Sequence, residues 1–291
     1  MKIAAMVLTA CAALTYAASF GLYFVRRREA FERRGLVLVG AGLCLHTAAI
    51  VLFWIAYRVP PWSTACGVLA FWSWTAVVVL MVLAARRGMR VLGAFIVPVA
   101  LMMFAAAFVV SKEPFEMPAG PSPLMAAHIP LVFLSYTAFL YAAVAGALYV
   151  AQDRRIKRKG PEAVFGRIPP LEWLERFTAG ALVAGFVVLT LGLALGFAWL
   201  SSAGLREGWR DPKIVAISIA WLLYGGLVVA RLAAWVRGRR VAAMAVVCFV
   251  LVLALHVFVR HAIPEDLPAS GAPPTPGEAP GQRAGEAPGQ P

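Results

Sequence analysis

Long apolar runs separated by short polar breaks repeat along almost the whole chain. Each run has about 20 residues or more, enough for a helix to cross the roughly 30 Å of hydrocarbon in a bilayer. The pattern therefore predicts an all-α, polytopic membrane protein whose membrane domain occupies residues 1–262. We predict eight transmembrane helices, at about residues 3–25, 35–57, 62–84, 90–110, 124–151, 177–200, 213–236 and 240–261.

The last part of the chain has a different composition. Residues 263–291 are rich in Pro, Gly, Ala and Glu, and the sequence GEAPGQ occurs twice, at 277–282 and 285–290. Such a segment cannot bury enough apolar surface to offset the conformational entropy lost on folding. We predict a disordered C-terminal tail without chemistry of its own.

Charge and composition give the expected orientation. The chain is 62% hydrophobic and only 14% charged, whereas a soluble domain carries about 25% charged residues. Basic clusters follow every second predicted span, at Arg26–Arg34, Arg86–Arg90, Arg154–Arg176 and Arg237–Arg240. The positive-inside rule places these loops in the cytoplasm and both chain ends outside it. The net charge of +13 is then explained by orientation in a lipid bilayer, and no nucleic-acid-reading motif accompanies it.

Histidines are the polar groups of interest inside the spans, because no predicted span contains Asp or Glu. An intramembrane carboxylate is typical of proton- or cation-coupled transporters, so its absence disfavours that function. His128 and His256 lie in different spans at matching heights, roughly 6–8 Å inside the outer boundary. Two neutral imidazoles facing each other can ligate one iron axially, as in a bis-histidine haem. The alternative for each is a hydrogen bond to a neighbouring helix, and this alternative is favoured for His46, in the middle of the second span.

Two polar segments between spans are of interest. The break from Leu200 to Asp211 contains Trp209 between Arg206 and Arg210. A flat ring beside two cations can hold a planar anionic ligand by stacking and charge pairing, although an ordinary interface anchor explains Trp209 equally well. The second segment, Gly166–Phe177, is predicted to be an amphipathic lead-in along the membrane interface, or a surface linker.

Five stretches, in a fixed order, carry a resemblance to a known family. They are HIPLVFLSYTAFLYAAVAGALYVAQDRRIK (His128–Lys157), RIPPLEWLERF (Arg167–Phe177), GFVVLTLGLALG (Gly185–Gly196), GWRDPKIVAISIAWLLYG (Gly208–Gly225) and LALHVF (Leu253–Phe258). Together they resemble the cytochrome c assembly proteins of the CcsA and HemX type, which include the YpjD group. The resemblance covers roughly residues 36–262 and is most specific from the fifth to the seventh span.

The resemblance implies a bacterial inner-membrane protein of cytochrome c biogenesis that binds or presents haem outside the cytoplasm. Carried over by position, His128 and His256 would be the axial ligands of the haem iron, and Trp209 and Asp211 would belong to the Trp-rich loop. His46 resembles the histidine of the second span in the HemX and YpjD branch. The implied cofactor is a non-covalent, b-type haem. The implied partners are a second membrane protein of cytochrome c biogenesis and apocytochrome c.

The sequence departs from the pattern of the family's haem-attaching synthetases at three places. The loop has a single Trp, Ile214 replaces the Glu after Pro-Lys, and Val229 occupies the position of a second intramembrane histidine. These departures favour the HemX and YpjD branch and predict that the chain is not an enzyme on its own. Two alternative functions follow from this branch. One is a HemX-like regulator or scaffold that docks a cytoplasmic enzyme of tetrapyrrole synthesis through Arg154–Arg176, and the other is a YpjD-like accessory of ion homeostasis.

Overall fold

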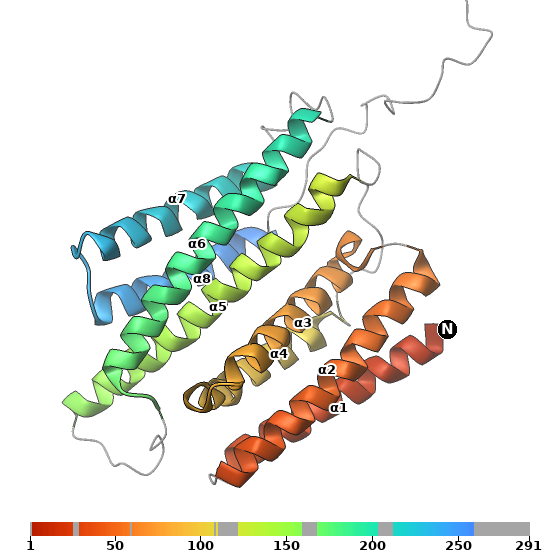
Figure 1. Cartoon of the computed structure of the whole chain (residues 1–291), viewed down its shortest axis with the longest axis horizontal. Helices are drawn as coiled ribbons and strands as arrows, with labels where there is room; N and C mark the ends of the chain where they lie inside the picture. The colour runs from red at the N-terminus through yellow and green to blue at the C-terminus, as the bar shows by residue number, and fades with distance from the viewer. Residues whose placement is uncertain are drawn as a thin grey trace, which may run out of the picture.

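The computed structural model describes residues 2–25, 29–58, 60–107, 109, 122–158, 168–202 and 212–258. Within these ranges the chain is helical and contains no β-strand, which confirms the predicted all-α class (Figure 1). The predicted tail, residues 263–291, lies outside the described residues. The elements are α1 (Lys2–Val25), α2 (Glu29–Tyr57), η1 (Pro61–Ser63), α3 (Ala65–Ala84), η2 (Arg87–Leu92), α4 (Gly93–Ala106), α5 (Pro123–Lys157), α6 (Leu171–Ser202), α7 (Pro212–Leu232) and α8 (Arg239–Phe258).

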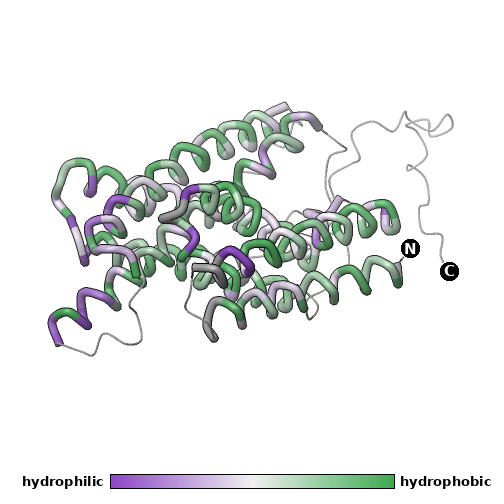
Figure 2. Tube along the Cα trace, turned by 60° about the horizontal axis from the view of Figure 1, so that its bottom comes forward, coloured by the Kyte–Doolittle hydropathy of each residue, from purple (hydrophilic) through white to green (hydrophobic). Residues whose placement is uncertain are grey.

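The helices have the length and composition of membrane spans. Seven helical segments in the described chain are long and apolar enough to cross a bilayer. They are Ile3–Leu22, Arg33–Tyr57, Ala65–Ala84, Met89–Ala106, Pro123–Lys157, Leu171–Ser202 and Ile214–Leu232. The eighth helix, α8, has 20 residues, which is about 30 Å at 1.5 Å per residue. Apolar residues follow the helices along their length, and hydrophilic residues gather at helix ends and turns (Figure 2). The chain is a multi-pass membrane protein, and its orientation in the bilayer stays a prediction.

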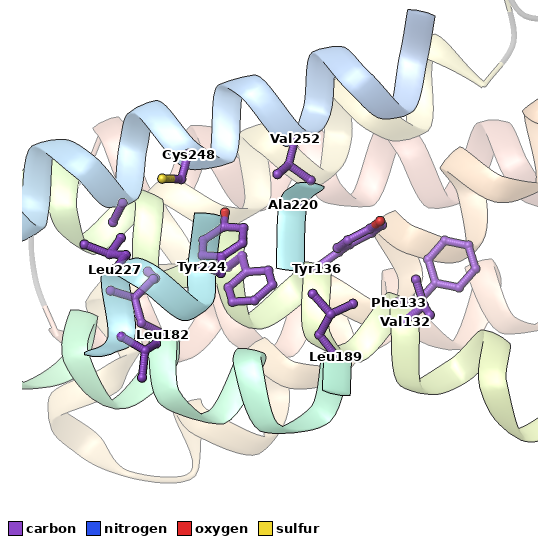
Figure 3. Close-up of a cluster of buried hydrophobic side chains, with 14 of the residues drawn as sticks. Val132, Phe133, Tyr136, Leu182, Leu189, Ala220, Tyr224, Leu227, Cys248 and Val252 are labelled. Atoms are coloured by element: carbon purple, nitrogen blue, oxygen red, sulfur yellow. The ribbon is translucent and has the colours of Figure 1, made fainter. Parts of the chain in front are cut away.

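The eight helices form two groups of four. Helices α1 to α4 pack around a buried cluster that includes Tyr16, Leu80 and Phe104. Helices α5 to α8 pack around a second cluster, in which Tyr136 of α5 and Tyr224 of α7 are buried (Figure 3). The two groups lie side by side, with α3 and α4 between the α1–α2 pair and the second group (Figure 1).

Helices α3 and α5 join the two groups. The Tyr141 hydroxyl of α5 donates a buried hydrogen bond of 3.0 Å to the carbonyl of Ala76 on α3. One to two turns away, the rings of Trp72 and Tyr136 are in contact with centroids 5.7 Å apart. An aromatic and hydrogen-bonded seam therefore holds the two groups together.

Glycines let α5 approach its two main neighbours closely. A Cβ placed on Gly185 of α6 would lie 2.6 Å from the ring of Phe139, and one placed on Gly146 of α5 would lie 2.6 Å from the carbonyl oxygen of Ala242 on α8. Helices in lipid gain little from burying apolar surface, so close contact at small residues is a main source of their association. Helix α5 is thus the centre of the second group.

The predicted interfacial lead-in, Gly166–Phe177, is different in the structure. From Leu171 onwards it is the first part of α6 and continues directly into the span. Leu174 is fully buried against α5, and the rings of Trp173 and Phe177 stack with centroids 5.0 Å apart and planes 6° apart. These apolar residues share the face that the rest of α6 presents to α5, so the helix continues along α5 and is not laid on the membrane surface.

Candidate functional site

His128 is held between α5 and α6. It is the sixth residue of α5, which begins at Pro123, a residue whose fixed φ suits the first turn. Its Nδ1 lies 2.7 Å from the carbonyl oxygen of Gly192 on α6. A Cβ placed on Gly196 would lie 2.8 Å from the imidazole ring, so the ring occupies the space that this glycine leaves.

The contact with Gly192 fixes the tautomer of a neutral His128. A carbonyl oxygen only accepts hydrogen bonds, so Nδ1 must carry the proton and donate it. The lone pair of the imidazole is then on Nε2, the nitrogen on the other side of the ring. Histidines that ligate metals use this arrangement, with the non-ligating N–H held by a carbonyl or carboxylate. This hydrogen bond leaves Nε2 as the nitrogen that could ligate a metal, and it is equally an ordinary helix–helix hydrogen bond.

Gly192 and Gly196 are partners of His128 that inspection of the sequence did not single out. Together with Gly185 they lie on one face of α6, because separations of seven and four residues bring a helix back to the same side. All three contact α5. This spacing was the signal that could have found them, since small residues on one face of a span mark a close helix contact.

His256 is near the end of α8, and its side chain lies outside the described structure. The backbone still gives its height relative to α5. Gly146 of α5 lies against Ala242 of α8, and the two helices run in opposite directions (Figures 1 and 3). Moving 14 residues from this contact leads to Val132 on α5 and to His256 on α8. His256 is therefore level with a point one turn, about 6 Å, from His128.

The polar break of the sequence connects α6 to α7, and Trp209 and Asp211 lie outside the described residues. The helix ends that flank it, Ser202 and Pro212, are at the end of the second group where α5 begins and α8 finishes (Figure 1). The topology thus brings His128, the backbone of His256 and the two helix ends that flank the polar break to one end of one helix group.

His46 belongs to the other group and is completely buried in it. Its Nδ1 lies 3.3 Å from the Tyr16 hydroxyl, and its ring centroid is 4.1 Å from that of Phe104. Its Nε2 makes no hydrogen bond within the described part of the chain, although the backbone of Ala70 interacts with the imidazole. A porphyrin beside this ring would have to displace Phe104, so ligation by His46 requires a different packing of the first group.

The described residues contain no group of three or more His, Cys, Asp or Glu side chains that could hold a metal ion. A haem needs only one or two axial donors. The donor chemistry of His128 fits this need, because its Nδ1 is hydrogen-bonded and its lone pair is on the opposite nitrogen.

Trp221 and Tyr224, which belong to the Gly208–Gly225 stretch of the resemblance, fix α7 in place. Trp221 Nε1 donates a hydrogen bond of 2.9 Å to the hydroxyl of Thr190 on α6. The Tyr224 ring stacks on Phe139 of α5, with centroids 3.5 Å apart and planes 3° apart. The Tyr224 hydroxyl points towards α8 (Figure 3) and has no hydrogen-bond partner among the described residues.

Comparison with known proteins identifies the family. A family model described as "Cytochrome C assembly protein" matches residues 62–263. The chain belongs to this family. The match begins at η1 and includes His128, His256 and the Trp209 loop, whereas α1, α2 and His46 precede it.

Relatives within the cytochrome c assembly family carry several names. Cytochrome c biogenesis protein CcsA of Prochlorococcus marinus is 24% identical over 262 residues, which cover 81% of this chain and 82% of the relative. Protein HemX of Bacillus subtilis is 27% identical over 251 residues, covering 84% and 90%. A protein of Azospirillum brasilense described as uncharacterized is 29% identical over 242 residues, covering 80% and 85%. The family predicted from the sequence is confirmed, and its CcsA and HemX branches are both similar to this chain.

Proposed function

We propose that this chain acts in cytochrome c biogenesis, binding haem at the extracytoplasmic face with His128 and His256 as axial ligands. Family membership and the likeness to proteins named CcsA support the process. The observation that carries the site is the hydrogen bond between His128 Nδ1 and the Gly192 carbonyl, which directs the imidazole lone pair to Nε2. The bacterial inner membrane is the proposed location.

Each residue of the proposed site has a separate role. Gly192 holds the proton of His128 on Nδ1, and Gly196 leaves room for the ring. His256 supplies the second imidazole from α8. Trp209 stacks on the porphyrin face within the loop that also contains Asp211. The haem itself, bound non-covalently as a b-type group, is the cargo to be passed on towards apocytochrome c, with a second membrane protein of cytochrome c biogenesis as partner.

Absorption spectroscopy tests this proposal. The detergent-purified protein is supplied with haem, and its spectrum is recorded in the oxidised and in the reduced state. We expect a low-spin bis-histidine spectrum in the wild type, because two imidazoles give a strong axial field. His128→Ala and His256→Ala should each lose it, and His261→Ala, a histidine outside the proposed pair, should keep it. A wild type that stays colourless with added haem, or equal loss in all three variants, contradicts the proposed site.

A regulatory scaffold is the second candidate, and the likeness to HemX supports it. Helix α5 ends with Arg154, Arg155 and Lys157, on the predicted cytoplasmic side, where they would face an acidic surface of a tetrapyrrole-synthesis enzyme. Lys157 is paired with Asp153 at 3.0 Å and would exchange this partner on docking. This function would be favoured if the purified protein retains such an enzyme and shows no haem in its spectrum. The retention should be lost when these three basic residues are changed to Gln.

A further inference from the structure

A groove lies between α6 and α7, far along both helices from His128. It has a volume of about 500 Å³ and is lined by Ala179, Gly180, Val183 and Ala184 of α6 and by Arg231 and Leu232 of α7. The two helices contact each other nearer the His128 end, where Trp221 is bonded to Thr190. They draw apart towards the start of α6 (Figure 1), and the residues that line the groove lie at this end of the two helices.

The α6 wall of the groove is apolar and made of small side chains. Three of its four residues are Ala or Gly, and Val183 is the fourth. A Cβ placed on Gly180 would meet nothing within 4 Å, so open space lies directly in front of this wall. A shallow apolar channel of this kind suits an extended hydrocarbon chain.

Arg231 brings a positive charge to the groove. One of its terminal nitrogens lies 3.3 Å from Glu175 Oε1, which also accepts a hydrogen bond of 3.0 Å from the backbone N–H of Gly238. The Arg231 Nε is buried and has no hydrogen-bond partner among the described residues. A guanidinium has five N–H donors. Glu175 takes one and the Nε donor is buried, so the remaining donors are on the terminal nitrogens.

The height of Arg231 matches a lipid phosphate. It is 19 residues after the first residue of α7, Pro212, so it lies about 28 Å along the helix from that end. This is close to the roughly 30 Å thickness of the hydrocarbon core, and hence to the headgroups of the opposite leaflet. Exposed Arg237, Arg239 and Arg240 follow shortly after it and add positive charge at the same level.

We propose that this groove binds one anionic phospholipid of the leaflet that the positive-inside rule makes cytoplasmic. Its phosphate lies against Arg231, and one acyl chain runs along the α6 wall past Gly180. A lipid fits better than a soluble anion, because the wall of the groove is apolar and belongs to two helices with the length and composition of membrane spans. This site is independent of haem binding and holds whether or not the proposed function is correct.

Native mass spectrometry tests the proposal. The delipidated full chain is titrated with phosphatidylglycerol or with phosphatidylcholine of the same acyl chains, and the bound lipid is measured. We expect the wild type to prefer phosphatidylglycerol. Gly180→Leu fills the channel and should weaken phosphatidylglycerol binding about tenfold, which corresponds to about 1.4 kcal/mol. Arg231→Gln should remove the preference for the anionic headgroup, because a charge-assisted hydrogen bond is lost.

Gly226→Leu is the matched control. Gly226 is an exposed residue of α7 that does not line the groove, and a Cβ placed on it would meet nothing within 4 Å. This variant should bind phosphatidylglycerol like the wild type. Ala184→Leu, a second groove-filling change, replaces Gly180→Leu if that variant elutes as an aggregate in size-exclusion chromatography. Equal binding by groove-filled and control variants, or no preference for phosphatidylglycerol in the wild type, overturns the proposal.

Discussion

Replacing Gly196 by Ala is the most direct test of how His128 is held. The added methyl carbon would lie 2.8 Å from both Cε1 and Nδ1 of the His128 ring, a distance at which something must move. The ring cannot retreat freely, because its Nδ1 is bonded to Gly192 only 2.7 Å away. We expect the imidazole to shift and this hydrogen bond to lengthen or break.

The size of the effect follows from two opposing contributions. Gly to Ala in a helix interior stabilises by about 1 kcal/mol through backbone entropy, and adding a methyl group to a packed contact costs about 1–3 kcal/mol. Gly180→Ala provides the first contribution alone, because a Cβ there meets nothing within 4 Å. The difference in unfolding free energy between Gly196→Ala and Gly180→Ala should therefore equal the steric cost, about 1–3 kcal/mol.

Thermal unfolding of both variants in the same detergent measures this difference, with Gly196→Ala melting at the lower temperature. The haem spectrum provides a second result, since a displaced His128 should weaken the low-spin signal only in Gly196→Ala. Equal melting temperatures for the two variants would show that His128 does not pack into the space beside Gly196. If the two variants melt at different temperatures but give identical haem spectra, His128 does pack against Gly196, but this packing does not affect haem ligation.

Three further predictions concern the helix contacts, each checked by thermal unfolding beside the wild type. Gly146→Ala should destabilise by about 1–3 kcal/mol, because its methyl carbon would lie 2.6 Å from the rigid backbone oxygen of Ala242; unchanged stability would contradict the close α5–α8 contact. Tyr141→Phe should lose about 1 kcal/mol with the hydrogen bond to Ala76, and a neutral result would mean that this bond does not link the two groups. Tyr224→Phe should be neutral or stabilising, because its buried hydroxyl has no hydrogen-bond partner among the described residues; clear destabilisation would reveal an acceptor that the described part of the chain lacks.

The sequence was sufficient to predict the helices, because a span is determined by a local run of apolar residues. The matching heights of His128 and His256 were predicted by counting residues along each span, and the backbone of α8 puts His256 about one turn from the level of His128. The sequence did not identify Gly196 as the residue beside His128, because the register between α5 and α6 depends on how two surfaces fit together. The same reason explains the lead-in to α6, where Leu174 packs on α5 and so extends the helix beyond the predicted span.

His46 shows that the position of a histidine within a span does not reveal its role. Its place in the middle of the second span was predicted, and so was the alternative of a structural role. Its enclosure by Tyr16 and Phe104 depends on helices α1 and α4, which are distant in sequence. The roles of Trp209 and Asp211 in the loop after α6 stay predictions.

The division of the helices into two groups has a consequence for how the protein is made. Each group consists of four consecutive helices, but each buried cluster includes a helix of the other group: Leu140 and Tyr141 of α5 belong to the first cluster, and Trp72 of α3 belongs to the second. The first cluster is therefore incomplete until α5 has left the ribosome, as synthesis proceeds from the N-terminus. Helix α5 completes this cluster when it packs on α3, where Ala76 accepts the Tyr141 hydrogen bond. Assembly of the two halves is thus coupled through α5, although the family match covers the first half only from η1 onwards.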